Sequence, residues 1–420
     1  MRKPADPKDP ARTASVVEQA TRPRTADVSR GTNQSGVRLY NERLVLSLIR
    51  RHGNLPKADI ARLTRLSPQT ITLIMRQLEA DGLVTKLDRR RGRIGQPSVP
   101  FALNPDGAFS LGLKIGRRSS DLVLMDLVGT VRGALHDTFD YPTPQAILGY
   151  CGSDVESLIQ TLPEELRDRI AGLGIAAPFE LWNWEEEIGA PRAVLDQWRD
   201  FSILEEITEH CPWPVSLCND ATAACGAELV LGNPRHFLDF LYFFVGSFVG
   251  GGVVLDGNLY AGSRGNAGAV GSMPIACPEG SQPTQLIRHA SIYVLQNRLT
   301  EAGIDPSVLW RSPDDWGDLG STLEIWIEEV AASLAYAAVA AATVIDFPAV
   351  IVDGAFPTSV RKRIVSALGD NVERFDLQGL SSFEVVEGSI GSGARAIGGA
   401  CLPLLANFSR DRDVLFKETI

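Results

Sequence analysis

Several side chains that could read the edges of base pairs share one face of a predicted helix. The helix follows Ser67, a residue type that caps helix starts, has Pro68 in its first turn and stops before Gly82. Apolar residues three and four positions apart form its buried face: Ile71, Ile74, Met75 and Leu78. The opposite face then carries Gln69, Thr72, Leu73 and Arg76. On base edges, glutamine favours adenine, arginine favours guanine, and leucine can contact the thymine methyl group.

A basic turn follows this helix. Residues 89–96 read RRRGRIGQ and join two strand-like runs at 83–88 and 97–104. Guanidinium groups at such a tip can bind phosphates or enter a minor groove, whose potential is negative. Taken alone, a charged run of this kind is more often only a solvated surface. The residues of this turn that we expect to contact nucleic acid are Arg89, Arg90, Arg91, Arg93 and Gln96.

Two further predicted helices precede these elements. Apolar residues at helical spacing indicate one helix over residues 41–52 and another over 56–65, with Pro56 in its first turn. Three helices followed by two strands around a basic turn are typical of a winged helix-turn-helix module. We expect this module over residues 36–103, with Ser67 and Thr70 among its DNA contacts.

The two parts of the chain differ in charge. Residues 1–103 hold 20 Lys and Arg against 9 Asp and Glu, whereas the remaining residues hold 21 against 42. The formal net charges are therefore +11 and −21, which sum to the −10 of the whole chain. This division predicts that the first part meets a polyanion, here double-stranded DNA, while the second folds around something else.

Composition bounds the class of protein. The 420 residues are 44% hydrophobic, which suffices for two or three packed cores. The longest uncharged apolar runs, 240–254 and 330–345, are shorter than the ~20 residues that cross a bilayer, so we expect no membrane partner. Residues 1–35 have a net charge of +3 and no apolar run, which predicts a disordered basic tail, no secretory signal and a cytoplasmic protein. The six cysteines lack CxxC spacing and are expected to be small buried side chains.

Strand and helix signals alternate through the rest of the chain. Strand-like runs at 109–116, 120–127 and 130–139 precede a helix over 155–166, a strand over 171–178, a helix over 201–210, a strand over 215–220 and a helix over 221–232. The pattern then repeats with a hairpin over 239–257, a helix over 323–345, a strand over 349–354 and a helix over 393–405. Such a repeat predicts a duplicated α/β fold with a cleft between two lobes.

The order of short segments resembles the ROK family, which groups bacterial transcriptional repressors with sugar kinases on an actin-like (ribonuclease H-like) ATPase fold. The matching segments are GLV after the third helix, RIGQPSVPFALN before LGLKIG, GLGIAAP, PVSLCNDATAACGAEL, GNLYAGSRGNAGAVGSMPI and GSGARAIGGACLPL. The resemblance implies a two-lobed α/β domain over residues 106–408, followed by a C-terminal tail at 409–420. Kinase members lack the winged module, so its presence points to the repressor branch.

The family's first phosphate loop, Asp-x-Gly-Gly-Thr-Lys, is altered here. The chain has instead Lys114, Ile115, Gly116, Arg117, Arg118 and Ser119. A cation replaces the acidic residue, and arginines stand where close approach of a phosphate favours small residues. We therefore expect neither ATP nor Mg²⁺ as a cofactor. Glycines at 246 and 250–252 fit either a second phosphate loop or an ordinary hairpin bend.

The family's sugar and zinc residues are retained only in part. Asn219 and Asp220 match its sugar-hydroxyl ligand and base, although a carboxylate that caps the following helix would look the same in sequence. The family's Gly-Glu-x-Gly-His is here GAVGS from Gly268, and of its zinc cysteines only Cys277 remains, so we expect no metal site. The resemblance thus implies an effector site at Asn219, Asp220 and Gly268 that takes a less hydroxylated ligand or none.

These features predict a sequence-specific DNA-binding transcriptional regulator, a repressor of carbohydrate-related genes. Its ROK-like domain is expected to lack catalytic residues, to form a homodimer or tetramer on a palindromic operator, and to sense a small molecule such as a sugar or its derivative. Two alternatives stay open. One is a sugar kinase that carries a DNA-binding module, and the other is a DNA-binding protein that senses no ligand.

Overall fold

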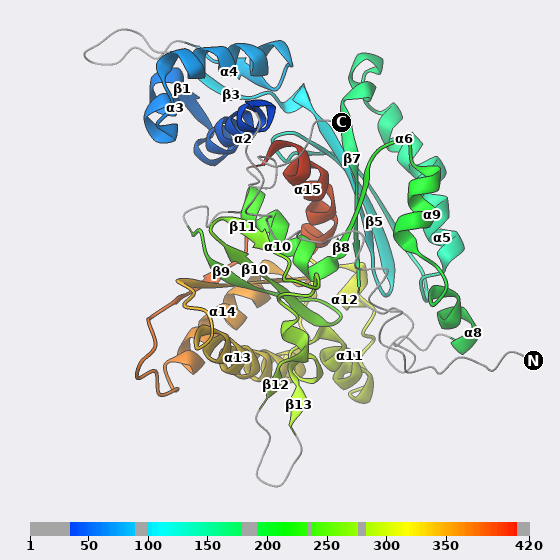
Figure 1. Ribbon diagram of the computed structural model, residues 1–420. Coiled ribbons are helices and arrows are strands. Elements are labelled where there is room, and N and C mark those ends of the chain that lie inside the picture. The colour runs from blue at the N-terminus through cyan, green and yellow to red at the C-terminus, as the bar shows by residue number, and fades with distance from the viewer. Residues whose placement is uncertain (1–33, 89–98, 179–190, 233–236, 276–282, 410–420) are drawn as a thin grey trace, which may run out of the picture.

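The structure is a computed structural model that describes residues 34–88, 99–178, 191–232, 237–275 and 283–409. The chain forms a small N-terminal head and a larger body of two lobes, with the head over one end of the body (Figure 1). The predicted tails, the basic turn at 89–96 and Cys277 lie outside the described residues, apart from the few tail residues nearest the domains.

The head has the predicted winged helix-turn-helix architecture. Its elements are α2 (Gln34–His52), β1 (Asn54–Pro56), α3 (Lys57–Thr64), α4 (Pro68–Ala80), β2 (Val84–Lys86) and β3 (Pro100–Leu103). The three strands form one sheet in the order β1-β3-β2. The third helix, α4, is the element that the sequence pattern located best, because its cap, its first-turn proline and its apolar spacing agree.

The first two elements of the head differ from the prediction. Helix α2 begins at Gln34 rather than at residue 41, and Pro56 ends strand β1 instead of lying in a helical turn. The Pro56 backbone is extended, with φ −74° and ψ 152°, so α3 starts one residue later. Strand β1 exists because β3 pairs with it, Leu55 opposite Phe101, and this distant partner leaves no local signal in the sequence.

The two lobes of the body repeat one topology. Lobe 1 contains β4 (Phe109–Ile115), β5 (Ser119–Asp126), β6 (Val131–Thr138), β7 (Ile170–Ala177) and β8 (Val215–Asn219), in the order β6-β5-β4-β7-β8. Lobe 2 contains β9 (Phe240–Val245), β10 (Val249–Leu255), β11 (Asn258–Tyr260), β14 (Ala349–Gly354) and β15 (Glu384–Glu387), in the order β11-β10-β9-β14-β15. In each sheet the three strands that come first in the chain are antiparallel neighbours. The last two strands run parallel to the first strand, β4 in lobe 1 and β9 in lobe 2. The duplicated α/β fold is therefore confirmed.

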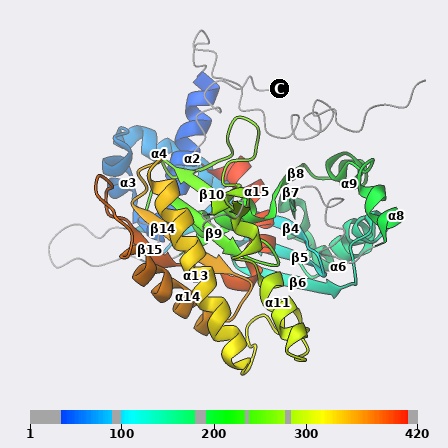
Figure 2. The same cartoon turned by 90° about the horizontal axis from the view of Figure 1, so that it is seen from below.

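Helices cover these sheets, as Figure 2 shows from below. They are α5 (Pro144–Gly149), α6 (Val155–Gln160), α8 (Arg192–Leu195), α9 (Ile203–His210), α10 (Asp220–Leu231), α11 (Ile292–Glu301), α12 (Val308–Arg311), α13 (Gly320–Ala342), α14 (Thr358–Val372) and α15 (Ala394–Phe408). The helix predicted over 155–166 stops at Gln160, shortly before Pro163, which favours a chain break. Small strands β12 (Pro274–Ile275) and β13 (Thr284–Gln285) pair with each other beside lobe 2.

By length and composition, α13 could cross a membrane. In the structure, however, it is the core helix of lobe 2. Its residues Trp326, Val330 and Leu334 are fully buried in the same hydrophobic cluster as β14 and α14. The apolar character of α13 is explained by this packing.

The last helix of each half packs against the other half. Helix α10 follows β8 of lobe 1 but lies on β10 of lobe 2, whereas α15 follows β15 of lobe 2 but lies on β4 and β7 of lobe 1. The two helices also contact each other between the sheets (Figure 1). A Cβ atom at Gly174 of β7 would fall 1.9 Å from the carbonyl oxygen of Gly399, so this approach requires glycine.

The head is packed on the end of α15. Val45 and Ile49 of α2 share one hydrophobic cluster with Leu127, Cys401 and Leu404 of the body. The Arg50 guanidinium also donates to the carbonyl oxygen of Leu127 at 2.8 Å. The head is thus continuous with the hydrophobic core around α15.

We expect Gly174→Ala to destabilise the protein, because its new methyl group would meet backbone atoms of Gly399 that cannot yield locally. Overpacking of this kind costs about 1–3 kcal/mol and would lower the melting temperature in calorimetry. Gly369→Ala is the matched control. Gly369 lies in α14 with nothing within 4 Å of its virtual Cβ, so alanine there should leave stability unchanged or raise it by up to ~1 kcal/mol. Equal melting temperatures for the two variants would refute close packing at α15.

Candidate functional site

The outer face of α4 carries the predicted base-reading side chains. Gln69, Thr72 and Arg76 are exposed, and Leu73 is 68% exposed, which is unusual for a leucine. The opposite face is buried at the four predicted apolar positions. The structure thus places Gln69, Thr72, Leu73 and Arg76 together on a surface that the fold itself does not use.

Hydroxyl groups at the start of α4 serve the helix itself. The Ser67 hydroxyl accepts a hydrogen bond from the Thr70 amide at 3.1 Å and lies 2.9 Å from the Thr70 hydroxyl. The Thr72 hydroxyl donates to the carbonyl oxygen of Pro68 at 2.8 Å. By contrast, the side chains of Gln69 and Arg76 have no hydrogen-bond partner within the described part of the chain. These two are therefore the residues most available to bases.

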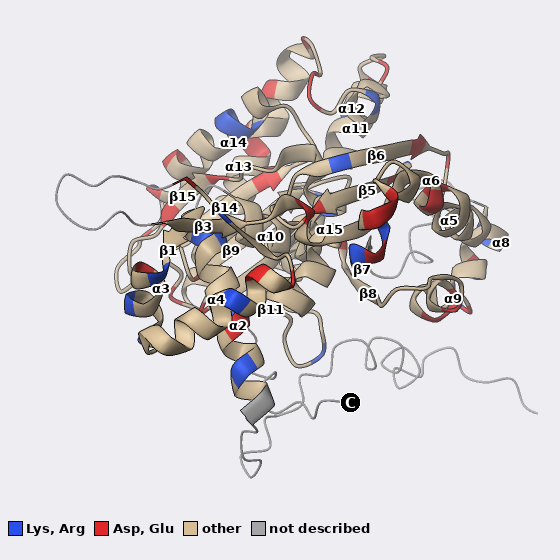
Figure 3. Ribbon diagram, turned by 90° about the horizontal axis from the view of Figure 1, so that it is seen from above, with Lys and Arg blue, Asp and Glu red and all other residues tan. Residues whose placement is uncertain are grey.

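Basic side chains lie on the helices of the head (Figure 3). Arg65, in the turn between α3 and α4, is exposed and has a left-handed backbone with φ 58°. The sequence pattern places Arg65 at the end of the helix predicted over 56–65 and does not single it out. Two other cations of the head are paired with carboxylates: Arg62 with Asp59 in α3, and Lys86 of β2 with Glu79 at the end of α4.

Two adjoining pockets lie between the lobes. The smaller one, of about 240 Å³, brings together all three predicted effector residues, Asn219, Asp220 and Gly268. The larger one, of about 450 Å³, contains the altered phosphate loop. Arg117, Ser247 and Arg395 line both, so the two pockets form one cleft.

In the smaller pocket, Asn219 and Asp220 are already engaged by the protein. The Asn219 side-chain oxygen caps α10, since it accepts from the amides of Ala221 at 3.1 Å and Thr222 at 3.3 Å. One Asp220 oxygen accepts from the Ala221 amide at 2.9 Å, and the other pairs with Arg395 at 3.2 Å. Both side chains are half-buried, so any ligand here would share them with these partners.

Glycines in and beside the smaller pocket are required by packing. A Cβ atom at Gly250 would lie 2.6 Å from that of Ala221, and one at Gly252 would lie 2.5 Å from that of Cys225. Both glycines therefore let α10 approach β10, which favours the structural explanation over a phosphate loop. Gly268 has φ +78°, and its Cβ would lie 2.6 Å from the Cα atom of Gly252. Its lack of a side chain is likewise required by the fold.

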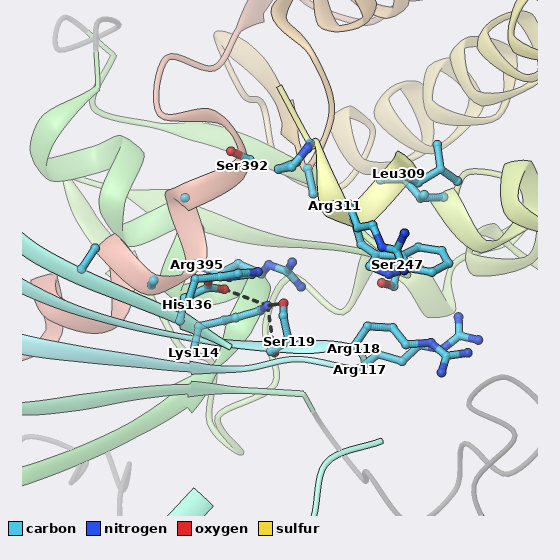
Figure 4. Close-up of a pocket in the computed structure, with 18 of the residues that line it drawn as sticks. Lys114, Arg117, Arg118, Ser119, His136, Ser247, Leu309, Arg311, Ser392 and Arg395 are labelled. Atoms are coloured by element: carbon cyan, nitrogen blue, oxygen red, sulfur yellow. Dashed lines mark hydrogen bonds and ion pairs between the residues drawn. The ribbon is translucent and has the colours of Figure 1, made fainter. Parts of the chain in front are cut away.

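Lys114 occupies the acidic position of the phosphate loop and is buried. Its ammonium group donates to the Ser119 hydroxyl at 2.7 Å and carbonyl at 3.1 Å, and pairs with Asp121 at 2.9 Å (Figure 4). Burial, together with the positive charge of Arg395, lowers the pKa of Lys114 to about 8. Asp121 also lies 2.5 Å from the His136 ring nitrogen, so its carboxylate is shared between two nitrogen groups.

Arginines from lobe 1 reach aromatic rings of lobe 2 across the cleft. Arg117 lies over the ring of Phe248, and Arg118 lies over Trp310, each 5.9 Å from the ring centroid. Arg311 of α12 also lines the larger pocket (Figure 4). The sequence pattern singles out Arg117 and Arg118 in the phosphate loop but not Arg311 or Arg395, because α12 carries no motif and Arg395 is included only in a segment that resembles the family.

The described residues hold no group of three or more His, Cys, Asp or Glu side chains that could bind a metal ion. Within the same ranges five cysteines are free, and three of them are buried, namely Cys151, Cys225 and Cys401. Cys211 and Cys218 are only half-buried, so the prediction of small buried thiols is too general.

The lowered pKa of Lys114 predicts a pH-dependent stability. Below pH 8 both folded and unfolded chains hold its proton, and the folded state carries the full cost of the buried charge. Between pH 8 and 10.5 only the unfolded chain binds it, so raising the pH relieves this cost. The unfolding free energy of the wild type minus that of Lys114→Met should rise by up to about 3 kcal/mol over this window. Chemical denaturation at several pH values measures the difference; a constant value would contradict a perturbed lysine.

Comparison with family models gives two matches. Residues 38–85 match a model described as winged helix-turn-helix DNA-binding, and residues 110–286 match the ROK family. The match at 38–85 covers most of the head, from α2 to β2. The match at 110–286 covers lobe 1 and the start of lobe 2, including Asn219 and Gly268 of the smaller pocket.

Two curated relatives are similar along much of the chain. An uncharacterized protein, y4fQ, of Sinorhizobium fredii is 25% identical over 88% of this chain and 91% of its own length. The xylose repressor of Bacillus spizizenii is 24% identical over 58% of this chain and 62% of its own length.

Solved structures share the fold. A ROK family transcriptional regulator, a homologue of the Escherichia coli MLC protein, superposes with a TM-score of 0.66 and 20% identity, covering 91% of this chain and 98% of that one. A ROK family glucokinase from Streptomyces griseus, solved with glucose and AMPPNP, has a TM-score of 0.54 and 18% identity over 70% of this chain and 99% of its own. The match to the transcriptional regulator covers 91% of this chain and so includes the head. The match to the glucokinase covers only 70% of this chain. The chain thus carries a ROK family domain, matched over residues 110–286, behind an N-terminal winged helix-turn-helix head.

Proposed function

We propose that this protein is a sequence-specific transcriptional repressor of carbohydrate-related genes. The observation that carries the proposal is the outer face of α4, where Gln69, Leu73 and Arg76 are exposed on a module of the DNA-binding type. An arginine and a glutamine on such a helix suit guanine and adenine edges in the major groove. The similarity to a xylose repressor supports the link to carbohydrate genes.

In this proposal two or four copies assemble in the cytoplasm on a palindromic operator. Each head would insert its α4 into the major groove of one half-site, and the spacing of the half-sites would follow from the assembly. Ser67 and Thr70 would contact phosphates at the start of α4, next to exposed Arg65. Arg89, Arg90, Arg91, Arg93 and Gln96, which lie outside the described residues, would add contacts whose strength falls with salt.

The cleft would serve as the effector site. A small molecule in the smaller pocket would meet Asn219, Asp220 and the backbone of Gly268. Because Asp220 is paired with Arg395, a ligand that bonds to this carboxylate would also act on the first turn of α15. Effector binding is therefore coupled to the helix that connects the lobes.

Helix α15 provides the route from the cleft to the head. Its first turn carries Arg395, and its far end carries Leu404 in the hydrophobic cluster with α2. A shift of α15 on effector binding would change the angle of the two heads in the assembly, and with it the half-site spacing that fits. Such coupling is reciprocal, so operator DNA should change effector affinity by the same factor.

We infer that the ROK domain does not catalyse phosphoryl transfer. A kinase needs carboxylates to hold Mg²⁺ and to take a proton from the acceptor hydroxyl. Here Asp121 is bound to Lys114 and His136, and Asp220 is bound to Arg395. Among the described residues, the two carboxylates that line the pockets are thus each paired with a basic side chain of the protein itself.

Capture of genomic DNA fragments by the purified full-length protein tests the proposed function. The expected result is enrichment of a small set of fragments that share a palindromic site near carbohydrate genes. The assay is run at about 0.15 M salt, which is physiological ionic strength. Uniform recovery of all fragments would then refute sequence-specific binding.

Arg76→Ala should weaken operator binding about 10–100-fold, because a lost bidentate base contact costs about 1–3 kcal/mol. Its melting temperature should not change, since Arg76 is exposed and alanine suits a helix. Arg374→Ala, an exposed arginine beyond α14 in lobe 2, is the matched control and should bind the operator like the wild type. Titration of labelled operator measures both. Unchanged operator affinity of the Arg76→Ala protein would show that Arg76 does not contact the bases.

The wild type should show no ATP turnover with any hexose in a broad panel, because its candidate carboxylates are occupied. A coupled assay for ADP release measures this. Turnover that Asp220→Asn abolishes would instead identify a sugar kinase that carries a DNA-binding module.

A further inference from the structure

Arg65, in the turn between α3 and α4, has a backbone conformation that its residue type does not favour. Its φ of 58° and ψ of 21° lie in the left-handed region, and it caps the end of α3. In this region the Cβ atom approaches the following carbonyl oxygen too closely, which disfavours most residues other than glycine. Asparagine and aspartate tolerate the conformation better than arginine does. The turn therefore contains local strain.

Elsewhere the chain assigns this conformation to glycine. Among the described residues, thirteen glycines have a positive φ, whereas only Arg65 and Asp256 adopt one with a side chain. Asp256 is explained by its turn, because it precedes Gly257 in the two-residue connection between β10 and β11. Aspartate before glycine is a preferred pair for such a hairpin. No turn preference of this kind accounts for an arginine at position 65.

Within the described part of the chain, the exposed guanidinium group of Arg65 forms neither a hydrogen bond nor an ion pair. The bonds of the turn come from its neighbours. The Thr64 hydroxyl donates to the carbonyl oxygen of Ile60 at 2.7 Å and accepts from the Leu66 amide at 3.3 Å. A glycine at position 65 would keep these bonds and relieve the strain. An arginine retained under strain therefore indicates a partner outside the folded chain.

The other basic residues near this turn are partly occupied. From α3 to the end of α4 the chain has four of them. Arg62 pairs with a carboxylate of α3, and the Lys57 ammonium group lies over the ring of Phe101. Arg65 and Arg76 form no such contact among the residues that the structure describes. The charge available to a polyanion thus lies at two places, the turn before α4 and the outer face of α4.

The place of the turn in a helix-turn-helix unit determines which part of DNA it meets. When the second helix of such a unit lies in the major groove, the first helix crosses the DNA backbone. Helices α3 and α4 contact each other, and Arg65 lies two residues before Ser67, the cap of α4 (Figure 1). The turn between them then reaches the edge of the groove, where the phosphates are. An arginine suits a phosphate, to which it donates two parallel hydrogen bonds.

We propose that Arg65 binds a phosphate of the DNA backbone and that its strained conformation is retained for this contact. The proposal rests on the proposed function, because it takes α4 as the helix that enters the major groove. The contact carries no sequence information, since every base pair presents the same phosphates. Arg65 thus contributes to affinity for any duplex, whereas Arg76 contributes to the choice of sequence.

Binding of the full-length protein to two duplexes of equal length tests the proposal. One contains the operator recovered by genomic capture, and the other has an unrelated sequence. Arg65→Gly should bind both duplexes about tenfold more weakly for each head bound at low ionic strength, because a charged hydrogen bond is lost. The fall of log affinity with log salt should become shallower by about 1 for each head. Arg65→Lys, which retains the charge, should keep the wild-type salt dependence.

The same variant should melt at or above the wild-type temperature in calorimetry, because glycine adopts the left-handed region without strain. A structural role of Arg65 would instead lower the melting temperature together with the affinity. Asp256→Gly is the matched control. It removes the other side chain on a left-handed backbone, in lobe 2, and should bind both duplexes as the wild type does.

Three results would overturn the proposal: Arg65→Gly binds both duplexes as tightly as the wild type, its salt dependence is unchanged, or it melts well below the wild type. Sequence-specific binding that Arg65→Gly leaves unchanged refutes this inference alone. A wild type that binds the unrelated duplex but enriches no operator refutes the proposed function alone, since the unrelated duplex still reports on Arg65. A wild type that binds neither duplex at low ionic strength refutes both.

Discussion

Helix α15 lies between the two sheets at a distance that only small residues permit. Gly174 of β7 faces the carbonyl of Gly399, and Gly398 faces the backbone of Ala223 in α10, whose carbonyl oxygen would be 2.0 Å from a Cβ at Gly398. At such separations any movement of α15 must carry its neighbours with it, because interiors are close-packed and transmit strain. This packing sets the relative position of the lobes, the width of the cleft and the place where the head contacts the body.

The charges of the cleft depend on the same helix. Arg395 lies in the first turn of α15 and forms an ion pair with Asp220. Its positive charge helps to lower the pKa of the buried Lys114 nearby. A site that binds a metal nucleotide presents carboxylates to the cation and small residues to the phosphates. In this protein cations stand at those places, so the cleft has the opposite electrostatic character on an unchanged fold. A shared fold therefore coexists with different chemistry.

Local patterns predicted most of the regular elements. The cap at Ser67, the apolar spacing of α4 and the apolar runs of β7, β9 and β14 are signals carried by neighbouring residues, and each element formed close to its predicted bounds. Helices α11 and α14 and strand β15 were not predicted, and two further misses have a physical reason. Strand β1 exists through its pairing with β3, and α12 is a single short turn, so neither has a local signature.

By itself, the sequence determined the winged head followed by a repeated α/β pattern, the division of charge between head and body, the outward face of α4 and the departures from the family's acidic and metal-binding motifs. These properties depend on residue identity and near-neighbour spacing. Only the tertiary structure decided that Asn219 caps α10 while Asp220 pairs with Arg395, and that Arg118 and Arg311 face one pocket. These residues are far apart in the chain, and their meeting is set by how α10 and α15 cross between the lobes, which no local spacing encodes.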